Sequence, residues 1–247
     1  MQVDYEKLRE LVEWQIQEGI NGLVVLGSTG EHQAVSEEER AGVIKAVVQT
    51  ANKRVPVVAG TGSSLTATTI KLTQAAKDAG ADGCMVVCPF YVKPTQRGLY
   101  EHFKAVAAVG LPVIVYNNPS RTGVSIAPET VAELSKVPGI VALKDATGGV
   151  EQAIKISALC DITLFAGEDA LALPMMAIGA TGVMSILSNA APKKVLALTE
   201  AVQRGDYATA RQVQRNNFFL INSLFVESNP APTKAMLALM GKCSPAY

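Results

Sequence analysis

The chain has 247 residues, of which 49% are hydrophobic and 18% are charged, and its formal net charge at pH 7 is zero. This length suffices for one large core, and the sequence lacks a basic cluster with interleaved aromatic residues, which argues against nucleic-acid and anionic-membrane partners. The first turns carry charged residues and show no apolar signal region, so a cytoplasmic protein is expected. We therefore expect the partner to be a small molecule.

The first predicted element is an amphipathic helix. Apolar residues recur there at helical spacing, namely Tyr5, Leu8, Leu11, Val12 and Ile16. A capping box of Ser36 and Glu39 opens a second helix that extends to Thr50. Pro128 is typical of the first turn of another helix, and Lys136 of its end. Two further helices are predicted over residues 206–226 and 232–240.

Seven apolar runs of strand length alternate with helices along the chain. They cover residues 22–26, 55–59, 83–87, 112–116, 140–144, 162–166 and 182–186. Strict alternation of this kind predicts a parallel α/β fold. The uncharged stretch 170–192 is long enough for a membrane span, but proline, glycine and polar residues interrupt it. We interpret that stretch as a buried helix, turn, strand and turn.

The positions of polar groups distinguish two folds that fit this alternation. Polar or glycine-rich groups follow almost every strand, at residues 27–31, 60–62, 89–91, 116–118, 144–145, 167–169 and 185. A (β/α)8 barrel collects chemical groups at the carboxyl ends of many strands, whereas a doubly wound sheet binds ligands mainly at one switch point. The sequence therefore predicts a (β/α)8 TIM barrel. The absence of Gly-x-Gly-x-x-Gly after the first strand argues further against a dinucleotide site.

The predicted barrel lacks its first strand, because the chain begins with a helix where a strand is expected. Either the chain is a shortened form, or another segment or subunit closes the gap. Closure of some kind is expected, since two bare strand edges favour aggregation. We predict a catalytic barrel over residues 1–203 and a shortened helical segment over residues 204–247.

Histidine and cysteine chemistry has little support in the sequence. His32 and His102 are the two histidines, so a histidine-rich metal centre is excluded, and neither lies beside a candidate nucleophile. The four cysteines lack the spacing of a zinc site and are expected to be free, buried thiols; they are Cys84, Cys88, Cys160 and Cys243.

Lys144 ends the fifth apolar run, at the carboxyl end of a strand predicted to be buried on both faces. Burial lowers the pKa of a lysine from about 10.4, and a neutral amine is a nucleophile toward carbonyl carbon. Tyr116, at the end of the preceding strand, could act as an acid or base for the same reaction. The alternatives are a lysine that extends to solvent and a tyrosine of the core. Together these strand ends indicate Schiff-base chemistry.

Two more strand-end groups could hold carboxylates. Ser28 and Thr29 lie in a glycine-flanked turn before a helix, where hydroxyl and backbone N–H groups can bind an anion. Arg121 lies on the loop after Tyr116 and could bind a carboxylate through two hydrogen bonds. An ordinary tight turn and a solvated surface arginine are the alternatives.

Three motifs carry a resemblance to a known family: residues 27–31 (GSTGE), 116–123 (YNNPSRTG) and 144–148 (KDATG). At these separations they resemble the dihydrodipicolinate synthase branch of the N-acetylneuraminate lyase superfamily, over about residues 3–240. The resemblance implies a class I, Schiff-base lyase that joins pyruvate to L-aspartate 4-semialdehyde, early in lysine and diaminopimelate biosynthesis. It also implies that neither a metal nor an organic cofactor is needed.

The resemblance implies catalytic roles for four residues. Lys144 would form the imine with pyruvate. Ser28, Tyr116 and Tyr91 would form a hydroxyl relay for protons. In this family the tyrosine at the position of Tyr91 reaches into the site of the neighbouring subunit, which implies a homodimer that usually pairs into a homotetramer.

The resemblance also assigns substrate binding. Thr29 would hold the carboxylate of pyruvate, and Arg121 would hold that of the aldehyde. The backbone around Gly167 and Met184 would line the pocket. The GSTGE turn is common among sialic acid lyases, so it does not distinguish the branches, whereas Arg121 favours the synthases.

Two alternatives to a synthase stay open. One is another pyruvate-dependent aldolase or lyase of the superfamily that acts on a sugar acid, and the other is a non-catalytic paralogue with a ligand-binding or structural role. Within the synthase interpretation, weak or absent feedback by lysine is expected. The places that build the lysine pocket of inhibited members hold different side chains here, namely Glu37, Arg40, Ser64, Thr68 and Phe90.

Overall fold

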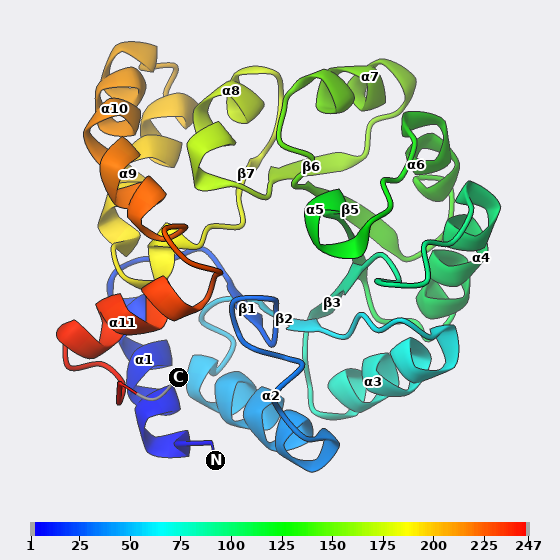
Figure 1. Ribbon diagram of the computed structural model, residues 1–247, viewed down its shortest axis with the longest axis horizontal. Coiled ribbons are helices and arrows are strands. Elements are labelled where there is room, and N and C mark those ends of the chain that lie inside the picture. Colours follow the sequence, from blue (N-terminus) through cyan, green and yellow to red (C-terminus); the bar gives the residue numbers. More distant parts are fainter. Residues whose placement is uncertain (1–2, 246–247) are drawn as a thin grey trace.

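The computed structural model describes residues 3–245, in which seven parallel strands curl into a ring inside a layer of helices (Figure 1). The strands are β1 (Leu23–Val25), β2 (Val57–Gly60), β3 (Gly83–Val87), β4 (Val113–Asn117), β5 (Ile140–Asp145), β6 (Thr163–Ala166) and β7 (Gly182–Val183). Each strand pairs with the next one in the chain. This sequential order is that of a TIM barrel, since a doubly wound sheet reverses its order at a switch point. The predicted fold is therefore confirmed.

Helices precede and connect the strands. They are α1 (Tyr5–Gln17), α2 (Glu37–Ala51), α3 (Thr66–Asp78), α4 (Gln96–Ala107), α5 (Pro119–Thr122), α6 (Pro128–Leu134), α7 (Glu151–Leu159), α8 (Ala172–Ala177) and α9 (Pro192–Gln203). All of these except the short α5 lie in the outer layer (Figure 1). Two 3-10 turns, η1 (Asp169–Leu171) and η2 (Leu187–Asn189), flank α8 and β7. After the barrel come α10 (Tyr207–Ser223) and α11 (Ala231–Leu239). The division at residue 203 into a barrel and a helical segment stays a prediction.

Local sequence signals account for the helix ends. The capping box of α2 is formed, because the Ser36 hydroxyl accepts from the Glu39 backbone N–H and a Glu39 carboxylate oxygen accepts from the Ser36 N–H, both at 3.2 Å. The uncharged stretch 170–192 folds as predicted, into helical turns around a short strand. Within the described residues, no helix combines the length and the apolar character that crossing a membrane requires. The cytoplasmic location stays a prediction.

The seventh strand is shorter than predicted. Its apolar run continues to Ile186, but only Gly182 and Val183 pair with β6. The backbone N–H groups of Ile186 and Leu187 instead donate to the carboxylate of Asp169, at 2.8 and 3.1 Å. These bonds draw the chain away from the sheet into η2, because a backbone N–H bonded to a side chain is not available to a strand ladder.

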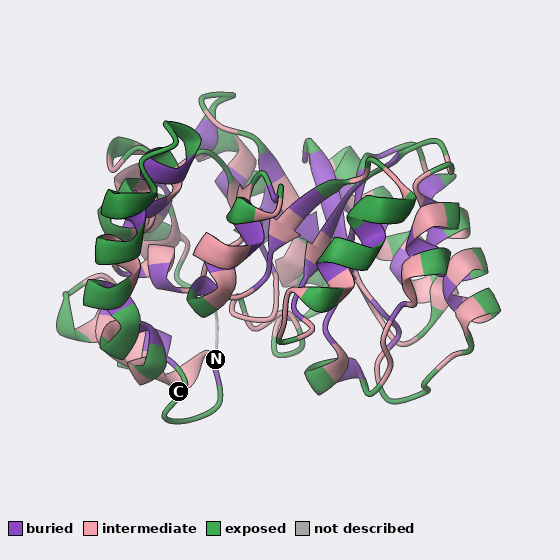
Figure 2. Cartoon of the chain, turned by 90° about the horizontal axis from the view of Figure 1, so that it is seen from above, coloured by how far each residue is buried: buried purple, intermediate pink, exposed green. Residues whose placement is uncertain are grey.

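Apolar side chains fill both surfaces of the sheet. The larger core lies between strands and helices and includes Val115 and Leu143, which are fully buried. A smaller cluster fills the inside of the ring, formed by Met85, Ile114, Tyr116, Ala142 and Ala146. Figure 2 shows the strands buried between helices whose outer faces are exposed. This interior cluster supports the residues that reach the carboxyl ends of β4 and β5.

The expected gap lies between β1 and β7, which are the two ends of the strand order. Within residues 3–245 these strands do not pair with each other. The side chain of Gln15, on α1, crosses the gap and donates to the backbone oxygens of Ser188 and Asn189 at 2.9 and 3.0 Å. We refer to this line between β1 and β7 as the seam.

Candidate active site

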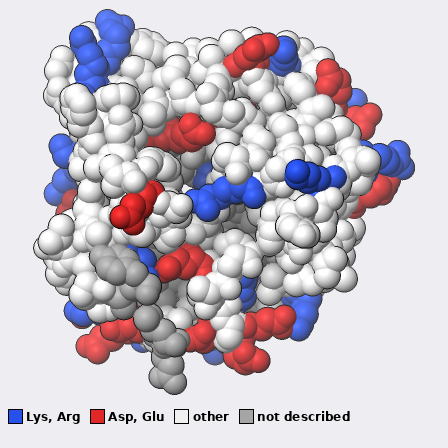
Figure 3. All heavy atoms as spheres, viewed as in Figure 1, with Lys and Arg blue, Asp and Glu red and all other residues white. Residues whose placement is uncertain are grey.

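A cavity of about 1480 Å³ occupies the carboxyl end of the barrel and continues along the seam to α1. All the predicted site residues except Tyr91 line it, namely Ser28, Thr29, Tyr116, Arg121, Lys144, Gly167 and Met184. In the space-filling view, basic and acidic side chains surround a hollow near the centre of this face (Figure 3). Residues that are distant in the sequence are therefore brought to one site, as expected for strand ends of a barrel.

Lys144 is fixed in the sheet between two paired neighbours. Its register partners are Tyr116 on β4 and Phe165 on β6. Its Nζ atom lies over the Tyr116 ring, 4.2 Å from the centroid. Desolvation lowers the pKa of Lys144 from 10.5 to about 8, with a further decrease from Arg121 and an opposing effect from Asp169. At pH 7, roughly a tenth of such amines are neutral and nucleophilic.

Tyr116 presents a neutral phenol beside this amine. Its side chain is 5% exposed, and Asn118 Nδ2 donates to its Oη atom at 2.7 Å. Burial raises the pKa of Tyr116, while the contacts of Asn118 and Ser28 with its hydroxyl oppose the rise. Because Oη already accepts from Asn118, the phenol hydrogen remains available to a group in the cavity. Ser28, in the turn after β1, lies close enough to share this hydroxyl chain.

Thr29 and Arg121 both line the cavity, Thr29 in the turn after β1 and Arg121 after β4. Arg121 belongs to the short helix α5 rather than to an irregular loop, because Pro119 opens a helical turn and Gly123, with φ of 73°, ends it. Both residues bond to Asn229, in the connection between α10 and α11. Asn229 lies outside the predicted barrel, so its sequence position gave no indication that it reaches this site.

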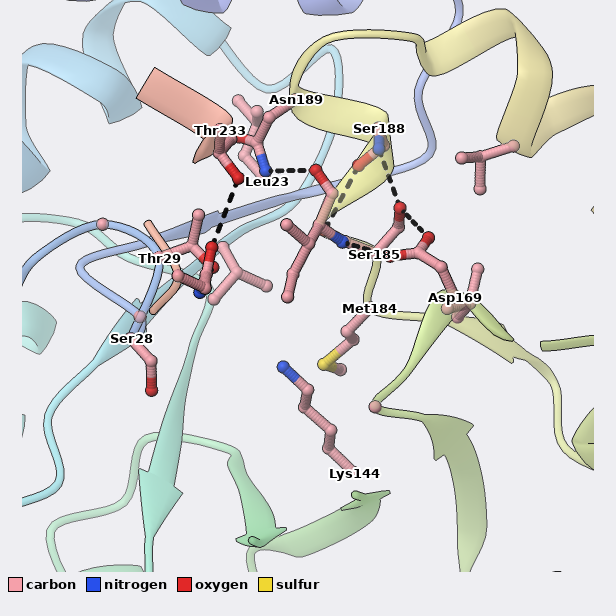
Figure 4. A pocket seen from close by; sticks show the side chains of 18 of the residues that line it. Leu23, Ser28, Thr29, Lys144, Asp169, Met184, Ser185, Ser188, Asn189 and Thr233 are labelled. Carbon is pink, nitrogen blue, oxygen red and sulfur yellow. Dashed lines mark hydrogen bonds between the residues drawn. The ribbon is translucent and has the colours of Figure 1, made fainter. Parts of the chain in front are cut away.

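Gly167 and Met184 line the wall formed by β6 and β7. A Cβ atom on Gly167 would lie 2.7 Å from both the Asp145 oxygen and the Ala146 Cβ, so only glycine fits there. The Met184 N–H donates to the Ala166 oxygen at 2.9 Å. In Figure 4 the side chains of Lys144 and Met184 extend into the same space, opposite Ser28 and Thr29.

Asp169 is a buried carboxylate. It follows the sixth predicted strand, but the sequence predicts no role for it. Besides the backbone N–H groups of Ile186 and Leu187, it accepts a hydrogen bond from the Ser185 hydroxyl (Figure 4). The Ser185 oxygen in turn accepts from the Ser188 N–H at 2.8 Å. Asp169 therefore fixes the backbone that follows Met184.

Tyr91 does not join the cavity of its own chain. Its side chain is 90% exposed, in the loop after β3, and its φ of 72° is in the left-handed region. A role in catalysis would require a second subunit, and it stays a prediction.

The four cysteines are free, as expected, and Cys84 and Cys88 are buried. The expected burial is wrong for Cys160 and Cys243, which are partly exposed. Among residues 3–245, no group of three or more histidine, cysteine, aspartate or glutamate side chains is arranged to hold a metal ion.

Comparisons with known proteins agree with the motifs. The model of the dihydrodipicolinate synthetase family matches residues 1–247. A 4-hydroxy-tetrahydrodipicolinate synthase from Geobacter metallireducens is 52% identical over 246 residues, which cover 98% of this chain and 85% of that protein.

Solved structures match as well. Dihydrodipicolinate synthase from Aquifex aeolicus superposes with a TM-score of 0.96 at 40% identity, covering 99% of this chain and 85% of that one. The chloride-inhibited dihydrodipicolinate synthase from Acinetobacter baumannii, complexed with pyruvate, has a TM-score of 0.95 at 43% identity, with coverage of 98% and 84%.

Proposed function

The chain belongs to the dihydrodipicolinate synthetase family, and from this premise we propose that it is a 4-hydroxy-tetrahydrodipicolinate synthase. It condenses pyruvate with L-aspartate 4-semialdehyde, as a lyase of lysine and diaminopimelate biosynthesis. The observation that carries the proposal is the environment of Lys144. Its amine, with a pKa of about 8, faces a large cavity beside a neutral phenol.

The reaction begins at Lys144. The neutral amine attacks the carbonyl carbon of pyruvate, and loss of water from the carbinolamine gives the imine. The protonated imine withdraws electrons from the methyl group, which loses a proton to form an enamine. Tyr116 supplies and accepts protons in these steps, because its hydroxyl hydrogen is free and its ring lies against the lysine.

The enamine carbon then attacks the aldehyde carbon of the second substrate. The resulting alkoxide takes a proton from the relay of Tyr116, Ser28 and the Tyr91 of a neighbouring subunit. The amino group of the second substrate attacks the imine carbon, which closes the ring and releases Lys144 as the amine. Overall, one pyruvate and one aldehyde give one cyclic product and the one water that is lost when the imine forms.

The two substrate carboxylates require separate binding groups. Thr29, in the turn after β1, holds that of pyruvate near Lys144. Arg121, exposed on α5 at the mouth, holds that of the aldehyde, and the backbone around Gly167 and Met184 forms the remaining wall. A guanidinium suits this role because it forms two parallel hydrogen bonds with a carboxylate.

The proposal includes a homodimer or homotetramer in which Tyr91 completes the site of the neighbouring subunit. Its support is the exposure of the loop after β3, where Tyr91 and its neighbour Val92 are 90% and 53% exposed. Apolar exposure of this kind is typical of a surface that a second chain covers. Sedimentation of the purified chain would show a monomer if this part is wrong.

Borohydride reduction in the presence of pyruvate tests the central claim. The expected result is a mass increase equal to the reduced pyruvate adduct, lost in Lys144→Arg. Wild-type protein without an adduct would indicate a non-catalytic paralogue. Consumption of L-aspartate 4-semialdehyde is then expected. If this aldehyde is not consumed while a keto sugar acid is cleaved, the sugar-acid alternative is correct.

A further inference from the structure

Asn229 contacts two side chains that the proposed function assigns to different substrates. Its Nδ2 atom donates to Thr29 Oγ1 at 2.9 Å, although the two residues are 200 positions apart. Its backbone oxygen accepts from Arg121 Nη2 at 3.1 Å. Asn229 is 7% exposed and lines the cavity. One buried residue of the carboxyl-terminal segment therefore joins the two proposed carboxylate-binding groups.

The direction of the bond to Thr29 determines what that hydroxyl can do next. An amide nitrogen only donates, so Thr29 Oγ1 must accept, and its own hydrogen remains for another partner. The amide orientation follows from Thr233, whose hydroxyl donates to Asn229 Oδ1 at 3.3 Å. A carboxylate in the cavity beside Thr29 would accept the remaining hydrogen.

The bond to Arg121 has a different consequence. The guanidinium has five N–H groups, and the backbone oxygen of Asn229 occupies one of them. The others remain for a ligand, while the long and exposed side chain is held at the mouth. An ion pair between Lys234 and Glu31, at 3.0 Å, ties α11 to the loop after β1 and keeps the segment in place.

We propose that Asn229 is a positioning residue for both substrate carboxylates. Its side chain leaves the Thr29 hydroxyl as a donor toward pyruvate, and its backbone oxygen holds Arg121 for the aldehyde. The inference rests on the proposed function and extends it to a segment outside the predicted barrel. Asn229 contacts Thr29 through its side chain and Arg121 through its backbone oxygen. A substitution of the side chain therefore changes the first contact and leaves the second.

Asn229→Asp is the decisive variant, because it keeps the shape and the backbone oxygen but replaces a donor by an acceptor. The Thr29 hydroxyl then donates to the new carboxylate, whose charge also repels pyruvate. The pyruvate concentration for half-maximal borohydride adduct should rise roughly tenfold or more, the effect of losing a charge-assisted bond. At saturating pyruvate, KM for the aldehyde should change less, since the contact with Arg121 persists.

Two further variants accompany it. Thr233→Val keeps the side-chain shape and removes the donor that orients the amide, so a smaller rise, roughly two- to fivefold, is expected. Asn216→Ala is the matched control, an exposed asparagine on α10 that accepts from Gln212, and it should leave both concentrations unchanged.

Two results would overturn the inference. If Asn229→Asp binds pyruvate within twofold of the wild type, the side chain does not position Thr29. If it lowers only the melting temperature, with both substrate concentrations unchanged, Asn229 is merely structural. A wild type that forms no adduct would overturn the proposed function as well, so the two failures are distinguishable.

Discussion

The two walls of the cavity are held in place by different kinds of bond. On one wall, β3, β4 and β5 have five or six residues each, and paired registers place Tyr116 beside Lys144. On the other wall, β1 and β7 have three and two residues and face each other across the seam. That wall is fixed by side chains: Gln15 and Asn229 donate hydrogen bonds across it, and Asp169 accepts them from backbone N–H groups. The nucleophile thus lies on a backbone-paired wall, whereas much of the substrate contact depends on individual side chains.

Lys144→Arg should have the largest effect on activity and little effect on folding. The guanidinium stays protonated and cannot attack a carbonyl, so the rate should fall by roughly a thousandfold or more. Because the paired wall does not depend on the side chain, the melting temperature should change little. Steady-state kinetics and thermal unfolding check both points, with the exposed Lys155→Arg as control. Substantial residual adduct formation would contradict the assignment.

Tyr116→Phe should lower kcat by roughly a hundredfold, the usual contribution of a positioned acid or base. The ring that lies 4.2 Å from Lys144 Nζ is retained, so the lysine should keep its environment. Tyr100→Phe, on α4, provides the control. A kcat close to that of the wild type would show that Tyr116 is not the acid or base, and that the paired wall contributes only the amine of Lys144.

Asp169→Asn tests the other wall and should act mainly on stability. An amide presents one oxygen and an NH2 group to a site in which two backbone N–H groups and a hydroxyl all donate. We expect the free energy of unfolding to fall by about 2 kcal/mol, the scale of hydrogen bonds to a charged group. Denaturant titration measures this loss, and Ser185→Ala should lose less. An unchanged midpoint would mean that the short β7 is held by other contacts.

Imine formation should depend on pH through Lys144. Its pKa is lowered to about 8, so the neutral amine increases as the pH rises and levels off above that value. The initial rate of adduct formation should therefore increase roughly tenfold between pH 7 and pH 9. Rapid mixing measures these rates. Asp169 raises the pKa of Lys144, so Asp169→Asn should lower that pKa and the rate should level off at a lower pH than in the wild type.

Lysine should have the smallest effect. At 1 mM it should leave more than half of the activity, since the family resemblance implies that Glu37, Arg40, Ser64, Thr68 and Phe90 occupy the places of the lysine-binding side chains. Glu37 in addition pairs with Lys71. Initial rates with and without lysine check this expectation. Half-maximal inhibition below 1 mM would contradict it.

The paired wall is also the part that sequence patterns predict well. Buried parallel strands are continuous apolar runs, and β3 lies where its run predicts, at residues 83–87. The run at 182–186 forms only two residues of strand, because Asp169 binds the backbone beyond them. That competition involves residues 17 and 18 positions apart and has no periodic signature.

The same difference applies to the site. Lys144, Tyr116, Ser28 and Thr29 could be predicted because each follows an apolar run at a strand end. Asn229 lies between two helices, where an Asn-Pro pair indicates a turn and nothing more. Its approach to Thr29 depends on how the last helices fold back over the barrel, a tertiary property that local pattern does not contain.

The seam gives the barrel a preferred line of opening. Separating β4 from β5 requires the rupture of a whole ladder of backbone bonds, whereas β1 and β7 share no ladder within residues 3–245. In hydrogen exchange, the amides of Val24 and Val183 should therefore exchange earlier than those of Val115 and Leu143. Transient widening along this line would admit water to the part of the cavity that α1 lines.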